Sequence, residues 1–179
     1  MDREQQYRKV LILGDIPIAQ EIYKFYYALQ YEVVYLKDFV ETDFNIIEFD
    51  ELFLLVKADG DCKALAMLYK LIGSNYNYLR KGGRLLCHLL LQERDTFRMI
   101  QACDFSDIIR GMIDVYPFTM TEVWSRSIVL DYEPITIHSD KHVHLVIFGM
   151  GEMAEIMAIQ AAHKAHYPNY VDPRITVIS

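Results

Sequence analysis

Three small residues near the C-terminus are spaced as a phosphate-holding turn requires. The segment from Gly149 to Ala154 reads G-x-G-x-x-A, and it follows an apolar run and opens a helical pattern. The first glycine permits a tight turn out of a strand, the second lets the backbone approach a pyrophosphate, and the alanine lets the helix pack closely. The phosphates would lie at the helix N-terminus, among unpaired N–H groups and the positive end of the helix dipole. The predicted site residues are Gly149, Met150, Gly151, Glu152, Met153 and Ala154.

A ribose contact is expected at the end of the next strand, where NAD-binding folds commonly carry Asp or Glu. Ser179 stands at this position, and its hydroxyl lacks the bidentate acceptor geometry of a carboxylate. The sequence therefore leaves NAD, NADP and an adenine nucleotide open as ligands. A strand–helix–strand unit that holds no ligand is the alternative interpretation.

Composition narrows the class of protein. The chain has 179 residues, 53% of them hydrophobic, which supplies ample core for a globular fold. A net charge of −7 argues against a large nucleic-acid interface. No run approaches about 20 apolar residues, and the charged start MDREQQYRK lacks the apolar core of a signal peptide. We therefore expect a cytoplasmic protein with no membrane insertion.

The cysteines predict neither a disulfide framework nor a zinc site. Cys62, Cys87 and Cys103 are odd in number, widely spaced and set in apolar surroundings. We expect buried free thiols.

Apolar runs alternate with helical patterns through the first 130 residues. The predicted strands cover residues 9–13, 32–36, 51–56, 83–91 and 112–116. The predicted helices cover residues 18–29, 61–79, 95–103 and 120–130. Strands rich in Val, Ile and Leu that alternate with helices pair in parallel and need both sheet faces covered. The sequence therefore predicts an α/β fold with a Rossmann-like doubly wound parallel sheet.

A polar, proline-containing stretch at 131–141 is the predicted linker. It separates a Rossmann-like domain at 1–130 from a second βαβ unit at 142–179, with a strand at 143–148, a helix at 152–166 and a strand at 175–178. About 40 residues bury too little surface to stand alone. We expect this unit to pack on the first sheet, to pair with another chain, or to be the truncated start of a longer domain. Its exposed sheet edge predicts a homodimer.

The first predicted strand ends in a degenerate copy of the same turn. Gly14 keeps the first glycine, but Ile16 replaces the second with a β-branched side chain that would block a phosphate. Asp15 adds a negative charge, and Pro17 removes a backbone N–H near the helix start. We interpret the first domain as a scaffold without dinucleotide binding.

The C-terminal unit resembles the TrkA-N type of NAD(P)-binding domain found in potassium-uptake regulators and channel RCK domains. Over most of its length the chain is similar to bacterial proteins that carry a TrkA-N domain ahead of a ryanodine-receptor-type domain. The resemblance implies a phosphate-loop role for Gly149, Gly151 and Ala154, a departure from the usual acidic residue at Ser179, and a ryanodine-receptor-type domain beyond residue 179. The residues that carry it are HLVIFGMGEMAEIMAIQAA, His166–Asn169, Arg174–Ile178, Val115–Thr119, Trp124 and Glu133–Ile135.

Three classes of function follow from these patterns. A non-catalytic, nucleotide-binding regulatory module in ion transport or ligand sensing is the leading hypothesis. A structural or assembly scaffold is the second, and an NAD(P)-dependent oxidoreductase the third. The sequence has no G-x-S-x-G elbow and no recognisable Cys–His spacing, so we predict no catalytic residue. His163 and His166 near a helix end are explained by the helix dipole, so we predict no metal site.

Overall fold

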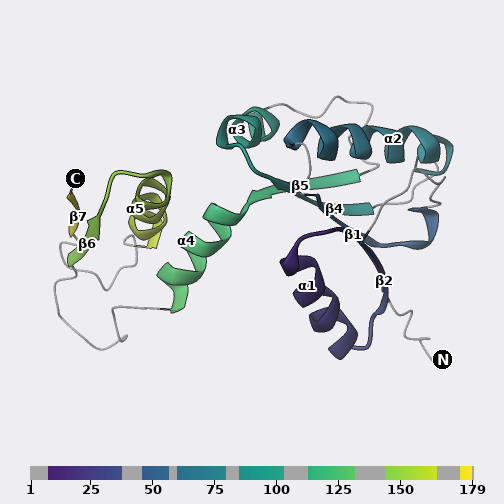
Figure 1. The fold of residues 1–179 in the computed structure, drawn as a ribbon, viewed down its shortest axis with the longest axis horizontal. Coiled ribbons are helices and arrows are strands. Elements are labelled where there is room, and N and C mark those ends of the chain that lie inside the picture. Colours follow the sequence, from purple (N-terminus) through teal and green to yellow (C-terminus); the bar gives the residue numbers. More distant parts are fainter. Residues whose placement is uncertain are drawn as a thin grey trace. The chain divides into compact units, whose positions relative to one another are not determined.

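The computed structural model describes residues 8–37, 46–56, 60–79, 85–102, 113–131, 144–164 and 174–178. The chain forms two compact units, Met1–Thr119 and Met120–Ser179. Each unit has its own parallel sheet, and Figure 1 labels most of the helices and strands of both.

The first unit is built on a five-stranded parallel sheet in the order β2-β1-β3-β4-β5. From β1 the strand order runs outward in both directions, which is the arrangement of a doubly wound sheet. The α/β, Rossmann-like fold class predicted from the sequence is confirmed. The strands are β1 (Lys9–Gly14), β2 (Glu32–Leu36), β3 (Glu51–Leu55), β4 (Leu85–Leu91) and β5 (Ile113–Thr119).

Helices cover both faces of this sheet. Figure 1 shows α1 (Pro17–Ala28) on one side and α2 (Asp61–Leu79) and α3 (Arg94–Ala102) on the other. A short 3-10 helix, η1 (Ile46–Glu48), precedes β3. Alternate strand residues point to opposite faces, so every second residue of the central strands enters the α2 side of the core. This cluster includes Leu11, Leu13, Leu52, Leu54, Cys87, Leu89, Leu68 and Leu71.

Two element boundaries differ from the sequence prediction for reasons of backbone chemistry. Strand β5 continues through Pro117 to Thr119, whereas the predicted strand stops at residue 116. Proline lacks an N–H, but β5 lies at the edge of the described sheet, where a strand tolerates that loss. Helix α1 begins at Pro17, because the first helical turn needs no N–H at that position.

The second unit contains a helix and a complete βαβ element. Its members are α4 (Met120–Asp131), β6 (His144–Phe148), α5 (Glu152–Lys164) and β7 (Arg174–Ile178). Strands β6 and β7 pair in parallel, with α5 as the crossover between them. Helix α4 packs against α5. This contact buries apolar surface that the βαβ element could not cover by itself. Of the predicted linker, Asp131 ends α4, and residues 132–141 lie outside the described residues.

The cysteine prediction is correct at one position and wrong at another. Cys87 is buried in β4, and this burial raises the pKa of its thiol to about 12. Cys62 is exposed, because it lies on the solvent side of the first turn of α2. Cys103 lies outside the described residues.

Candidate phosphate-binding loop

The loop between β6 and α5 has the backbone geometry that its glycines suggest. Gly149 follows the last residue of β6 and has a φ of +117°, a conformation that side-chain-bearing residues rarely adopt. Its N–H donates a hydrogen bond to the carbonyl of Ile178, 2.8 Å away, at the end of β7. The loop is therefore held at the carboxyl edge of the two-stranded sheet, where parallel α/β folds bind their ligands.

Space for a ligand is present at the second glycine. A Cβ placed on Gly151 would meet no atom within 4 Å, so the backbone is open on that side. The carbonyl of Gly151 accepts hydrogen bonds from the N–H groups of Ala154 at 3.0 Å and Glu155 at 3.2 Å, which close the first turn of α5. Ala154 is buried, as its predicted packing role requires. These features fit a phosphate that lies against the backbone.

Two large apolar side chains, one at the end of β6 and one in the loop, are exposed to solvent. Phe148 is 79% exposed and Met150 is 75% exposed. Large apolar side chains beside a phosphate-binding turn offer a surface on which a base or a ribose can pack. The sequence analysis included Met150 among the site residues and missed Phe148, although Phe148 directly precedes the first glycine.

Charge at the loop opposes an anion. Glu152 and Glu155 occupy the first turn of α5, where carboxylates compensate the same helix dipole that would attract a phosphate. Arg174 lies at the start of β7, at the opposite end of that strand from Ile178 and the loop. Arg174 is therefore not placed to pair with a phosphate at the loop, and the groups that the described residues offer there are backbone N–H groups.

Helix α4 positions α5 beneath the loop. The Ser125 hydroxyl is completely buried and donates a hydrogen bond to the Thr121 carbonyl at 2.7 Å. The same hydroxyl lies 3.0 Å from the Met153 sulfur, so Met153 contacts the helix rather than a ligand. Ser179, the predicted ribose contact, lies outside the described residues.

At the corresponding edge of the first unit, the first glycine and a buried carboxylate both have packing roles. A Cβ on Gly14 would overlap the carbonyl oxygen of Leu55, so this glycine serves the close approach of β1 and β3. The buried carboxylate of Asp61 accepts hydrogen bonds from the backbone N–H groups of Gln92 at 2.6 Å and Glu93 at 3.0 Å. This carboxylate joins the start of α2 to the segment that follows β4, a contact that sequence reasoning missed.

A polar cluster lies on the α1 face of the first sheet. A carboxylate oxygen of Glu51 receives hydrogen bonds from His88 Nε2 at 2.7 Å and from the Tyr26 hydroxyl at 3.0 Å. The His88 ring stacks on Phe53 with centroids 4.4 Å apart. Burial raises the pKa of Glu51, but the hydrogen bonds from His88 and Tyr26 outweigh it and leave that pKa below its ordinary value. Burial and the bond to Glu51 raise the pKa of Tyr26.

This cluster joins α1, β3 and β4, and we interpret it as a structural contact rather than as a catalytic site. Glu51 is only 8% exposed, and its hydrogen bonds satisfy a charge that would otherwise be costly to bury. The sequence offered a weak signal, since His88 interrupts an apolar strand, but its partners are far away in the chain.

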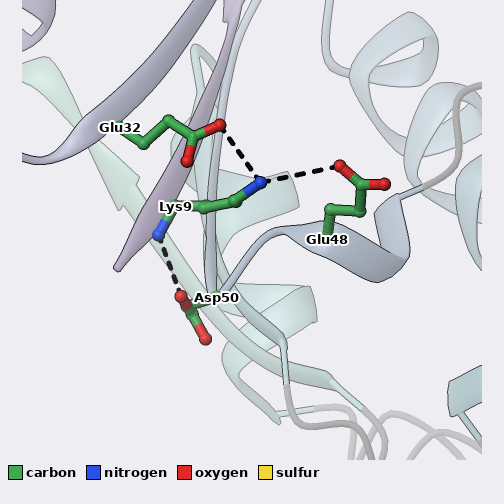
Figure 2. Close-up of polar contacts among 4 residues, drawn as sticks. All are labelled: Lys9, Glu32, Glu48 and Asp50. Atoms are coloured by element: carbon green, nitrogen blue, oxygen red, sulfur yellow. Dashed lines mark hydrogen bonds and ion pairs between the residues drawn. The ribbon is translucent and has the colours of Figure 1, made fainter. Parts of the chain in front are cut away.

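Figure 2 shows a second set of polar contacts, at the amino end of β1. The Lys9 ammonium lies 3.1 Å from Glu32 and 3.7 Å from Glu48, and its backbone N–H donates to Asp50 at 2.9 Å. The hydrogen bond to Glu32 raises the pKa of Lys9. These exposed contacts connect β1 to β2 and to the segment that precedes β3.

Other classes of site lack support in the described part of the chain. No group of three or more His, Cys, Asp or Glu side chains among the described residues could hold a metal ion. None of the helices described combines the length and the apolar character needed to cross a bilayer. Comparison of the chain with protein-family models, curated proteins and solved structures finds no match.

Proposed function

We propose that the chain is a non-catalytic regulatory module that binds a nucleotide at the loop from Gly149 to Ala154. The observation that carries this proposal is the combination of a positive φ at Gly149 with open space at Gly151, directly between a parallel strand and a helix N-terminus. Backbone N–H groups of the first turn of α5 would hold the phosphates, because the first turn of a helix leaves such groups without intrahelical partners.

NAD or NADP is the proposed ligand, with an adenine nucleotide as the simpler alternative. A ligand of this kind would act here as a signal, and its redox chemistry would go unused. The sequence resemblance to TrkA-N and RCK domains is the ground on which we propose a cytoplasmic role in ion transport or ligand sensing. It also supports a ryanodine-receptor-type domain as the part that responds to the nucleotide.

A homodimer is part of the same proposal. A regulatory module transmits ligand binding by changing its contacts with another domain or subunit. A second copy of the chain would supply that partner. Free strand edges among the described residues support self-association, since such edges pair readily with other strands.

A ligand-free scaffold is the competing function, and one observation favours it. Glu152 and Glu155 place two carboxylates in the turn that would hold the phosphates. If no nucleotide overcomes this repulsion, the βαβ element has only an architectural role.

A thermal-shift titration with NAD⁺, NADH, NADP⁺, ATP and ADP tests the proposal. A ligand at 100 times its Kd should stabilise the chain by roughly 2.7 kcal/mol. The Gly151→Ile variant should fold, because its side chain meets open space, but should lose the shift because the side chain fills the phosphate position. Gly73→Ile is the matched control, since Gly73 in α2 is equally open and far along the chain from the loop. No shift with any nucleotide in the wild-type chain would leave the scaffold function.

A further inference from the structure

Among the described strands, β2 lies at one edge of the first sheet. Among the described strands it pairs only with β1, and its sequence EVVYL is apolar after Glu32. An edge strand presents a row of backbone N–H and C=O groups that another strand can pair with, and proteins commonly protect such edges with lysine, proline or a bulge. No lysine or proline interrupts β2, so this edge is suited to pairing.

Tyrosine rings of α1 extend this edge into a wider surface. Tyr23 stacks on Tyr27 with ring centroids 5.8 Å apart, and its ring lies 5.9 Å from that of Tyr35 in β2. Helix residues four apart share a face, so the two α1 tyrosines and β2 form one continuous area, the β2 edge surface. Tyr27 is 67% exposed. Tyrosine combines a large apolar ring with a hydroxyl and is enriched at protein interfaces.

Charge favours a second copy as the occupant of this surface. The chain carries a net charge of −7, so two copies repel each other in general. At the β2 edge surface, however, the Glu32 carboxylate is already paired with the Lys9 ammonium at 3.1 Å, so β2 itself adds little to this repulsion. Antiparallel pairing of β2 with itself would also bring Lys37, just past one end of the strand, to the end where Glu32 of the other copy lies. Parallel pairing would instead bring the two Glu32 carboxylates together.

We propose that two copies of this chain associate through the β2 edge surface, with their β2 strands antiparallel. The inference rests on the homodimer of the proposed function and specifies where it forms. A two-fold axis perpendicular to the sheet joins the two sheets edge to edge and keeps both α1 helices on one face, so each surface meets its own copy. The tyrosines of the two α1 helices then face each other across the seam, which is the contact between the two β2 edge surfaces.

Lysine substitution on α1 tests this seam. Tyr27→Lys places a charge in the seam and should weaken dimerisation by more than about 30-fold, the loss typical of a central interface residue. Phe25→Lys is the matched control, because Phe25 is 61% exposed on the same helix and lies nearly opposite Tyr27 around its axis. Analytical ultracentrifugation over a concentration series measures both variants, and circular dichroism checks that each is folded.

Hydrogen exchange of β2 provides a second readout that requires no variant. Amide protons of β2 that point away from β1 should exchange more slowly as the wild-type concentration rises and dimers form. Exchange in β4, which is paired on both sides, should not depend on concentration. This measurement keeps the proposal testable if Tyr27→Lys fails to fold.

The outcomes separate the seam from the homodimer itself. A wild-type dimer, a monomeric Tyr27→Lys and a dimeric Phe25→Lys would support the seam. If both variants remain dimers and β2 exchange is independent of concentration, the homodimer stands but the seam is overturned. A wild-type chain that stays monomeric up to its solubility limit overturns both.

Discussion

At the scale of single residues, hydrogen bonding decides how Glu51 behaves. The carboxylate is nearly buried, yet His88 and Tyr26 stabilise its charged form and hold its pKa below the ordinary value of 4.5. A carboxyl group with a lower pKa in the folded state binds fewer protons there than in the unfolded chain, so stability rises with pH through this range. The contribution is present above about pH 4.5 and is lost as pH falls through the lower, folded-state pKa.

The Glu51→Gln variant tests this dependence. It should be less stable at neutral pH by about 1–3 kcal/mol, because it loses hydrogen bonds to a charged acceptor. Its free energy of unfolding should then fall less than that of the wild type between pH 5 and pH 3, roughly the range of carboxyl titration. Urea unfolding at several pH values measures both effects. Glu21→Gln, which removes an exposed carboxylate, is the control, and equal pH slopes for Glu51→Gln and wild type would contradict the prediction.

At the scale of elements, the two glycine turns use the same residue type for different purposes. Gly149 has a positive φ and opens a turn at the edge of the second sheet, whereas Gly14 lets β1 approach the backbone of β3. The sequence predicted that the first turn would not bind a dinucleotide, on the basis of Ile16. The attachment of Asp61 to the segment after β4 could not be predicted, because its hydrogen-bond partners lie 31 and 32 residues further along the chain.

Substitution of Gly14, the glycine at which β1 and β3 approach closely, should lower the stability of the first unit. Gly14→Ala forces a Cβ against the Leu55 carbonyl and should destabilise the first unit by about 1–3 kcal/mol or more. Gly73→Ala in α2 should have the opposite sign and stabilise by about 0.5–1 kcal/mol, because its Cβ meets nothing and alanine favours helix. Denaturant unfolding of both variants measures the difference, and equal stabilities would show that β1 and β3 can separate without cost.

At the scale of the whole molecule, the two units differ in how they bury apolar side chains. Every described member of the principal buried cluster, from Leu11 to Ile113, belongs to the first unit. The second unit depends on the packing of α4 against α5 and on two short strands. Units of such different core size should differ in stability.

Calorimetry of the whole chain should therefore resolve two transitions, with the second unit melting first. A nucleotide that binds at Gly149–Ala154 should raise the lower transition and leave the upper one unchanged, since ligand stabilises only what it binds. A single cooperative transition would contradict the predicted difference in stability between the two units.

Local patterns determined much of this protein by themselves. The alternation of apolar strands with helical segments, the parallel pairing and the placement of Gly149 at a strand end follow from periodicity and backbone preference, which act over a few residues. Tertiary structure decided the rest: the placement of α4 against α5, the anchoring of Gly149 to Ile178, the carboxylate of Asp61 at the first edge and the assembly of Glu51 with His88 and Tyr26. Each of these depends on contacts between residues far apart in the chain, and no local pattern specifies which distant partner will satisfy a buried polar group or cover a helix face.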